Sequence, residues 1–368
     1  MEAPTWLRLI LHAAFAGSLL CLQGCDPKSM LPPPNGTLPL PPPAPLPTLP
    51  PPAPLPTLIL PTVPPVPPPA VLVPPPPVTP AATPAPGSAL AAPPPGSTPR
   101  LIVKNICPDL EMWIASSGNV AAPRNVPIPP NGEYKYYIPD AGLSSTRFFP
   151  NLGCNSLGQN CVMGSSGGDG QDCPQAGCAP PIDSKFEASF GVKGVDCAKD
   201  NKGCDWWDTS AVDGYSLPYR VEISSECPQG KDIDCRGLSL SQCPSNEYLG
   251  SKIGQQDLKV IEPATKKVVG CYSPCGKLSY SNWLNPTGKN APNSEIAKMY
   301  CCPTPPVSSE ECRTGPVEQT AYVKLIHQYC PSVYGYAYDD AVGLQVCPSG
   351  TTYTWSIGCP MDPQVFTT

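Results

Sequence analysis

The chain has 368 residues, among them 58 prolines and 20 cysteines, and charged residues make up only 14% of it. Ordinary soluble domains contain about 5% proline and about 25% charged residues, so this composition is unusual in both respects. Only two histidines occur, His12 and His327, which excludes a zinc site built from several histidines. Residues 101–368 contain 20 Lys and Arg against 27 Asp and Glu, a net charge of −7, which argues against a nucleic-acid partner.

Residues 1–25 have the pattern of a secretory signal, with Arg8 followed by the apolar stretch Leu9–Leu22. That stretch is too short to span a bilayer as a stable anchor, and no second apolar segment follows it. The sequence Leu-Gln-Gly-Cys that ends at Cys25 also resembles a bacterial lipobox, in which Cys25 would be lipidated. We therefore predict a secreted protein, extracellular or associated with the cell wall or surface, and keep lipid anchoring through Cys25 as the alternative.

Residues 26–100 form a low-complexity segment. Residues 27–100 contain 32 prolines and no cysteine, and the nonamer PPPAPLPTL occurs at 41–49 and again at 50–58. Proline removes backbone donors and fixes φ, so this density predicts an extended polyproline-II segment in place of helix or sheet. At about 3.1 Å per residue its reach is at most roughly 230 Å. We predict a stalk, and keep a set of ligands for proline-binding modules as the alternative.

From Leu101 onwards the sequence becomes that of a globular domain, over 101–368. Short β-rich stretches recur between clusters of Gly, Pro and Asn, which is typical of a β-sandwich or barrel. The stretches expected to be strands are Leu101–Cys107, Glu111–Ala115, Tyr134–Ile138, Lys185–Phe190, Leu217–Ile223 and Tyr353–Ile357. Helices are expected over Val317–Tyr329 and Glu295–Tyr300. The sequence predicts a mainly β domain with a small helical, disulfide-rich part.

The domain contains 18 cysteines behind a secretory signal, which implies up to nine disulfides. The competing interpretation is zinc, suggested by Cys271-x3-Cys275 and the Cys301-Cys302 pair. Paired histidines and a CxxC repeat are both missing, so disulfides are favoured and no metal is expected.

Four passages together resemble the thaumatin-like proteins, the plant defence family that includes osmotin and zeamatin. They are Asn105-Ile106-Cys107 with Trp113-Ile114-Ala115, the run WDTSAVDGYSLP from Trp207 to Pro218, Tyr300-Cys301-Cys302 with Cys312, and CPSVYGYAYDD from Cys330 to Asp340 with Cys347-Pro348 and Cys359-Pro360. The resemblance covers about 260 residues and leaves out the proline-rich segment. It implies an all-β fold, a flattened β-sandwich with a small helical, disulfide-rich domain.

The resemblance also implies a pairing of the cysteines. By position, eight pairs carry over from the family, and Cys197 and Cys204 are left over in an insertion, where we predict that they pair. The expected bridges are Cys107–Cys359, Cys154–Cys161, Cys173–Cys178, Cys197–Cys204, Cys227–Cys347, Cys235–Cys330, Cys243–Cys271, Cys275–Cys301 and Cys302–Cys312.

Members of the family are known for an acidic cleft between the sandwich and the disulfide-rich domain, lined by an arginine, a glutamate and three aspartates. The glutamate carries over to Glu187 and the aspartates to Asp208, Asp213 and Asp339, which Asp340 follows. The arginine position falls on Asn151, a departure from the family, while Arg147 lies four residues earlier in a register that does not replace it. The loop at Ser165 and Ser166 also departs, because an Asp-Cys pair is usual there.

Glycoside hydrolysis needs one protonated and one ionised carboxyl group. Crowded carboxylates raise each other's pKa, and a missing arginine would raise it further. On this reasoning Glu187 is the expected acid and Asp208 its partner, with Asp213, Asp339 and Asn151 as contacts of the substrate.

Five aromatic residues near these acids could present flat faces to sugar rings, and packing is expected for at least three of them. They are Trp206, Trp207, Tyr215, Tyr336 and Tyr338, of which Tyr215 and Tyr338 are the candidate contacts. His327 is expected to be a packing or surface residue and not a catalytic base.

Three functions stay open at this point. The first is a secreted defence or wall protein that binds β-1,3-glucan, without a cofactor and as a monomer. The second is an endo-β-1,3-glucanase that uses Glu187 and Asp208. The third is a non-catalytic surface protein whose cleft is vestigial, because fold alone does not fix activity.

Overall fold

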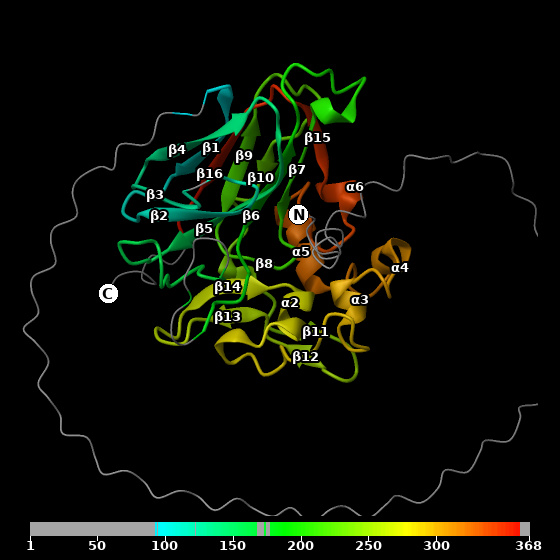
Figure 1. Cartoon of the computed structure of the whole chain (residues 1–368). Helices are drawn as coiled ribbons and strands as arrows, with labels where there is room; N and C mark the ends of the chain where they lie inside the picture. Colours follow the sequence, from blue (N-terminus) through cyan, green and yellow to red (C-terminus); the bar gives the residue numbers. More distant parts are fainter. Residues whose placement is uncertain (1–92, 94, 122, 168–172, 174–176, 361–368) are drawn as a thin grey trace, which may run out of the picture. The chain divides into compact units, whose positions relative to one another are not determined.

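A computed structural model describes residues 93, 95–121, 123–167, 173 and 177–360 (Figure 1). The predicted secretory signal, Cys25 and the predicted proline-rich stalk up to residue 92 lie outside the described residues, as do the last eight residues. No helix in the described part of the chain is long and apolar enough to cross a membrane.

Two β-sheets form the body of the domain. The five-stranded sheet has the order β10-β9-β16-β1-β4, in which β1 and β16 pair in parallel and the other neighbours are antiparallel. The bounds of its strands are β1 Ser97–Asn105, β4 Glu133–Pro139, β9 Tyr219–Ile223, β10 Ile233–Asp234 and β16 Tyr353–Ile357. The first and last long strands of the domain therefore lie side by side in one sheet.

The six-stranded sheet is antiparallel throughout and has the order β15-β7-β6-β5-β2-β3. The bounds of its strands are β2 Met112–Gly118, β3 Asn125–Ile128, β5 Leu143–Leu152, β6 Lys185–Phe190, β7 Cys204–Ser210 and β15 Gln345–Pro348. Each strand expected from the sequence is present, with its ends shifted by up to four residues.

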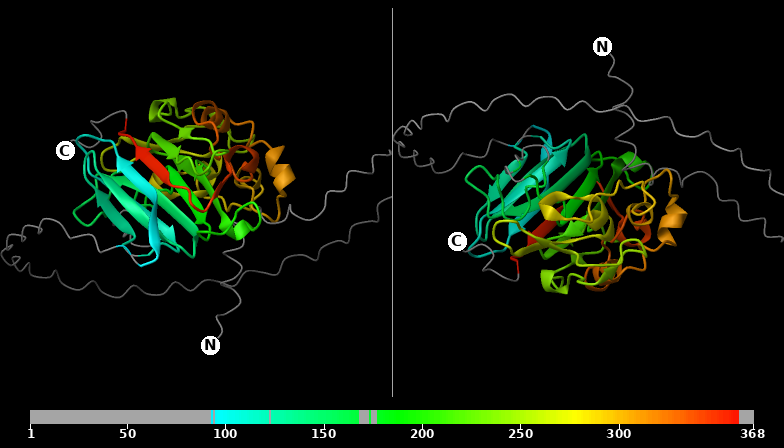
Figure 2. Two further views of the ribbon diagram at one scale, coloured as in Figure 1. Left: turned by 90° about the horizontal axis from the view of Figure 1, so that it is seen from above. Right: turned by 90° about the horizontal axis from the view of Figure 1, so that it is seen from below.

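The two sheets face each other (Figure 2), and large aromatic side chains from both are buried between them. Phe186 of β6 lies with its ring centroid 6.1 Å from that of Trp355 of β16, and Trp207 of β7 lies 4.9 Å from Tyr353 of β16. All four side chains are fully buried. Because side chains alternate along a strand, the residues next to Phe186 and Trp207 face the other side of the six-stranded sheet.

Smaller elements make up the rest of the domain, with β13, β14 and α2 below the sandwich in Figure 1. Their strands are β8 Gly214–Tyr215, β11 Glu247–Tyr248, β12 Gln255–Gln256, β13 Lys259–Ile261 and β14 Val268–Tyr272. The α-helices are α2 Pro274–Ser279, α3 Lys298–Cys301, α4 Ser309–Arg313, α5 Ala321–Tyr329 and α6 Asp340–Gly343, and the 3-10 helices are η1 Asn201–Gly203, η2 Leu240–Gln242 and η3 Asn282–Leu284.

Both expected helices are shorter than the sequence pattern indicated. Helix α5 begins at Ala321 because Thr320 is its N-cap and accepts a hydrogen bond from the Val323 amide, so residues 317–320 precede it as turns. The stretch 295–297 likewise precedes α3 as a turn. The mainly β fold with a small helical, disulfide-rich part is thus observed.

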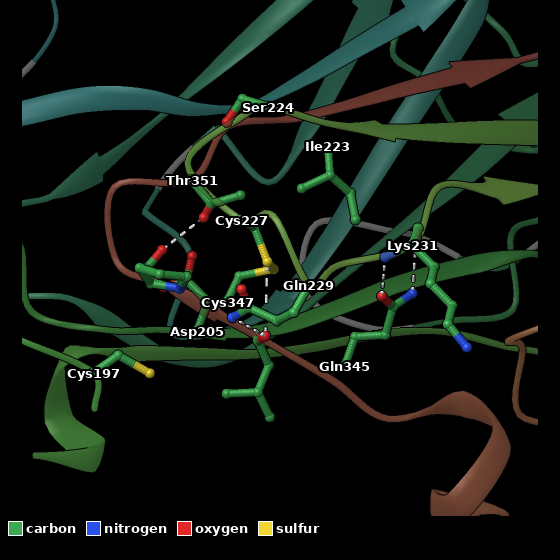
Figure 3. Close-up of a disulfide and its surroundings, with 12 residues drawn as sticks. Cys197, Asp205, Ile223, Ser224, Cys227, Gln229, Lys231, Gln345, Cys347 and Thr351 are labelled. Carbon is green, nitrogen blue, oxygen red and sulfur yellow. Dashed lines mark hydrogen bonds between the residues drawn. A yellow bond between two sulfur atoms is a disulfide. The ribbon is translucent and has the colours of Figure 1, made fainter. Parts of the chain in front are cut away.

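Nine disulfides join the described residues, and they are the nine pairs that the resemblance and the leftover pair implied. Figure 3 shows one of them, Cys227–Cys347, which ties the loop after β9 to β15. Beside it, the Gln345 side chain accepts a hydrogen bond from the Lys231 amide at 2.8 Å and donates one to the Lys231 carbonyl at 3.1 Å. The Gln345 side-chain amide thus forms the two hydrogen bonds that a backbone peptide group would form. These bonds hold β15 to the same loop that the disulfide holds.

Strand β1 begins at Ser97, four residues before the expected start of the domain, and it brings a charged side chain into the interior. A β-bulge between Pro99 and Leu101 turns Arg100 inward. Arg100 forms an ion pair with Asp205 of β7, and both side chains are almost fully buried.

The buried ion pair has a complete set of partners. Asp205 accepts hydrogen bonds from the Gly191 amide at 2.8 Å and from the Tyr353 hydroxyl at 2.9 Å, and Arg100 donates to the Gly191 carbonyl at 3.1 Å. The network joins β1 and β16 of one sheet to β7 of the other. A buried ion pair is tolerated in a protein interior when the polar atoms of both charged groups have hydrogen-bond partners, as they do here.

Replacing Arg100 by Met should therefore leave the Asp205 carboxylate buried without its counter-ion, at a cost of about 3–5 kcal/mol in the free energy of unfolding. Urea denaturation with the disulfides intact measures this loss. The matched control is Arg236→Met, which removes an exposed pair with Asp234 and should cost less than about 1 kcal/mol. Equal losses in the two variants would contradict the role assigned to Arg100.

Candidate functional site

Three charged side chains form a row across β5, β6 and β7. Arg147 of β5 is the partner of Glu187 of β6, and Glu187 is the partner of Asp208 of β7. Directly opposed residues of antiparallel strands point to the same face, with Cβ atoms about 4.5–5.5 Å apart. Phe186 and Trp207 point into the sandwich, so this charged row lies on the opposite face of the six-stranded sheet.

Arg147 belongs to this row, which corrects the expectation that its register excludes it. Its guanidinium forms an ion pair with Glu187, and about half of its side chain is exposed (49%). Glu187, and then Asp213 and Asp208, raise the pKa of Arg147, which shows that these carboxylates surround it. The expected loss of the arginine, and the rise in carboxylate pKa reasoned from it, are therefore wrong.

Asn151, to which the arginine position carried over, is fully buried and cannot contact a substrate from the surface. Its Oδ1 atom accepts a hydrogen bond from the Ser165 amide at 3.3 Å. Gly164 has a φ of +92°, and a Cβ there would meet the Asn151 side chain. Asn151 thus supports the loop that departs from the family pattern.

Asp208 is the member of the charged row with the most perturbed ionisation. Its withdrawal from water raises the pKa of the carboxyl group well above its ordinary value, and the neighbouring Glu187 and Asp340 raise it further. Arg147 acts in the opposite direction. Asp208 therefore holds a proton more readily than an ordinary aspartate, beside the arginine-bound Glu187.

A second cation lies near the row, and the sequence analysis missed it. Lys185 precedes Glu187 by two residues on β6 and forms an ion pair with Asp213. The Tyr280 hydroxyl lies 3.4 Å from the other oxygen of Asp213. Residues two apart on a strand point to the same face of the sheet, so the spacing of Lys185 and Glu187 was the sequence signal that could have identified this cation.

Asp339 does not lie in the charged row with Glu187 and Asp208, although the resemblance groups these residues together. Asp339 is buried, with its Oδ2 atom 2.7 Å from His327 Nε2 and accepting a hydrogen bond from the Gly335 amide at 2.9 Å. The next residue, Asp340, acts on Asp208 and pairs with Arg313 at 3.2 Å. Asp340 therefore replaces Asp339 as the fourth carboxylate near the row, and the hydrogen bond with Asp339 raises the pKa of His327.

The aromatic residues divide as expected, with three of the five packed inside. Trp207, Tyr215 and Tyr336 are buried, and the Tyr215 hydroxyl donates to the Ser239 carbonyl at 3.1 Å. Tyr215 is thus a core residue and not a surface contact. Tyr338 is half-buried, with its hydroxyl 2.7 Å from Thr304 Oγ1. Trp206 is half-buried and lies two residues before Asp208, on the same face of β7.

No group of three or more His, Cys, Asp or Glu side chains within the described ranges is placed to hold a metal ion. The four carboxylates near the row are instead accompanied by three cations, Arg147, Lys185 and Arg313. On this surface, cationic hydrogen-bond donors therefore lie next to anionic hydrogen-bond acceptors.

Asp183, in the loop before β6, is a buried carboxyl group beside this site. The Ser166 hydroxyl donates to its Oδ2 atom at 3.1 Å, while Oδ1 has no hydrogen-bond partner in the described structure. Burial raises the pKa of Asp183 to about 6, although Lys185 lowers it. The folded protein therefore binds this proton more tightly than the unfolded chain does.

Because the folded-state pKa of Asp183 is raised, its ionisation should destabilise the protein as pH rises from about 4 to about 6. The Asp183→Asn variant lacks this ionisation. Its free energy of unfolding relative to the wild type should increase by about 2 kcal/mol between pH 4 and pH 7 in urea denaturation. A difference between Asp183→Asn and the wild type that stays constant over this pH range would disprove the argument.

Comparison with known proteins identifies the family to which the domain is similar. Residues 105–360 match the model of the Thaumatin family, which is more than half of the chain. Thaumatin-like protein 1b of Malus domestica is 27% identical over 201 residues, which is 55% of this chain and 74% of that protein. A protein named glucan endo-1,3-beta-glucosidase from Prunus avium is 28% identical over 217 residues, which is 58% of this chain and 71% of that protein.

Among solved structures, the thaumatin-like xylanase inhibitor TLXI matches with a TM-score of 0.27 and 20% identity, over 37% of this chain and 82% of that one. The family match, the sandwich and the disulfides lead to one conclusion. The chain belongs to the thaumatin family.

Proposed function

We propose that this protein binds a β-1,3-glucan-type polysaccharide through the charged row Arg147, Glu187 and Asp208, as an extracellular wall or defence protein. The observation that supports this most is the cross-strand row itself, with half-buried Trp206 on the same face. Ionised groups and a protonated carboxyl group form strong hydrogen bonds with sugar hydroxyls, and an indole face packs on a sugar ring. The name of the Prunus avium relative is consistent with a glucan as the ligand.

Binding is favoured over hydrolysis because Glu187 is already held by Arg147. A carboxylate committed to a guanidinium is a weaker base and nucleophile than a free one. The same pairing keeps Glu187 and Arg147 in fixed positions, which suits recognition of a polymer by its hydroxyl groups.

Endo-β-1,3-glucanase activity is the second candidate, and the direct opposition of Glu187 and Asp208 favours it. The Cβ atoms of opposed residues lie about 4.5–5.5 Å apart, a spacing that allows the two carboxyl groups to approach the roughly 5 Å separation of a retaining glycosidase. Here the raised pKa of Asp208 makes it the candidate acid, with the arginine-bound Glu187 as its partner, the reverse of the roles inferred from the sequence. A proton on Asp208 would be lost as pH rises, so hydrolysis would be favoured on the acidic side.

Pull-down on insoluble β-1,3-glucan and release of reducing sugar test both candidates. Glu187→Gln and Asp208→Asn should each weaken glucan binding about tenfold or more, because each removes a charged or protonated partner of the sugar. The exposed control Glu310→Gln should bind as the wild type does.

The outcomes separate the functions. Binding without sugar release in the wild type supports the binding protein. Sugar release that falls by about 10²-fold or more in Asp208→Asn supports the glucanase. Wild type that neither binds nor hydrolyses the glucan contradicts both, and leaves the surface protein with a vestigial site.

The proposed location rests on the nine disulfides, because such bridges form in oxidising compartments. The signal over residues 1–25, the stalk over 26–100, the monomeric state and lipidation of Cys25 stay predictions. The mass of the mature N-terminus distinguishes cleavage alone from a lipid on Cys25.

A further inference from the structure

A second concave surface lies away from the charged row, among β13, β14, α2 and η3. Its cavity has a volume of about 240 Å³. Three lysine side chains and two aromatic side chains are among the residues that line it. The lining residues that matter here are Lys259, Lys266, Lys277, Tyr272, Trp283 and Leu284. We call this the lysine pocket.

The lysine pocket is a positive region on a negative domain. Residues 252–289 contain six lysines and two acidic residues, whereas residues 101–368 as a whole have a net charge of −7. Neither acid, Asp257 or Glu262, lines the cavity. Each instead accepts a backbone hydrogen bond at 2.9 Å, Asp257 from the Lys259 amide and Glu262 from the Ala264 amide. The lining therefore presents three ammonium groups and no carboxylate.

Lys277 is the most constrained of the three lysines. Its ammonium nitrogen lies 5.4 Å from the centre of the Tyr272 ring, within range of a cation–π interaction. Burial lowers the pKa of Lys277, although Asp257 acts in the opposite direction. An anion in the cavity would replace the water that this half-buried ammonium group has lost.

The apolar wall is held by an unusual turn. Trp283 and Leu284 have φ angles of 50° and 61°, a left-handed region that bulky residues rarely adopt and that clusters at functional sites. Asn285 locks the turn, because its side-chain amide donates to the Lys277 carbonyl at 2.9 Å and to the Tyr280 carbonyl at 2.7 Å. As a result Leu284 stands 85% exposed beside the lysines.

We propose that the lysine pocket binds an acidic polysaccharide, one that bears carboxylate groups on its sugar rings. The lysines match the carboxylates, and the half-buried Trp283 ring matches the apolar faces of the sugar rings, while Tyr272 holds Lys277. An anionic bilayer fits less well as the ligand. The site is concave, and Leu284 is the one leucine that protrudes from it, whereas stable membrane binding takes more than one anchor. The charged row, with four carboxylates in it or near it, does not suit such a polymer, so the two surfaces would take different glycans.

The test measures binding of polygalacturonate to the full chain by isothermal titration calorimetry at low salt. A highly methyl-esterified form of the same polymer is the matched ligand without charge. Polygalacturonate should bind and the esterified form should not, and added salt should weaken the binding because dissolved ions screen the attraction between the lysines and the carboxylates. Equal binding of the two polymers would overturn the proposal.

The variant Lys259→Gln/Lys266→Gln/Lys277→Gln should weaken the binding of polygalacturonate about tenfold or more, since three charge pairs are lost. The control Lys135→Gln/Lys199→Gln/Lys324→Gln changes the net charge equally at exposed sites elsewhere and should bind as the wild type does. If both variants lose affinity equally, the effect is one of net charge and the pocket is not the site.

Trp283→Ala should weaken binding while leaving its salt dependence unchanged, which separates the aromatic contact from the charges. Vesicles of phosphatidylcholine with phosphatidylserine provide the competing outcome. Binding to these vesicles but not to polygalacturonate would overturn the proposal in favour of a membrane surface. Glucan pull-down of the same variants should be unchanged, so failure here is distinct from failure of the charged row.

Discussion

The buried ion pair between Arg100 and Asp205 is the constraint on which the rest of the domain depends. It joins the strand that opens the domain to β7 of the other sheet, and the Tyr353 hydroxyl adds β16 to the same network. Charges withdrawn from water tolerate few alternative positions, so the pair fixes how the two sheets are aligned. Asp205 lies three residues before Asp208 on β7, and the position of the charged row follows from it.

The charged row differs from a simple acidic surface because its carboxylates are accompanied by cations. Glu187 is paired with Arg147, Asp213 with Lys185 and Asp340 with Arg313, while Asp208 has no such partner and has a raised pKa. Alternating charges hold each side chain in place and leave one carboxyl group able to keep a proton. Recognition of a neutral polymer by hydrogen bonds follows more directly from this arrangement than hydrolysis does.

The sequence predicted the fold well because long, specific patterns determine it. The run from Trp207 to Pro218 and the order of the cysteines identified the sandwich, and the site strands β6 and β7 followed. Glu187 and Asp208 were placed correctly near each other, since opposed strands bring them together.

The rest of the site depends on features that sequence spacing does not reveal. Strand β5 has an extra residue between Leu143 and Thr146 relative to β6, with Ser145 at a φ of 56°, and this bulge sets the face to which Arg147 points. Asp339 and Asp340 are adjacent, yet Asp339 is buried against His327 while Asp340 pairs with Arg313. Which of two neighbours points inward is decided by packing, and a single sequence does not contain that information.

The bridge between Cys107 and Cys359 joins residues 252 positions apart, close to both ends of the described domain. The intervening chain is therefore a covalent ring, and a single cut in any loop between the two cysteines leaves both pieces attached. The Cys227–Cys347 and Cys235–Cys330 bridges close further rings inside it. A domain linked in this way can survive a protease that nicks one exposed loop, because the nicked chain keeps its connections and its strands keep their partners.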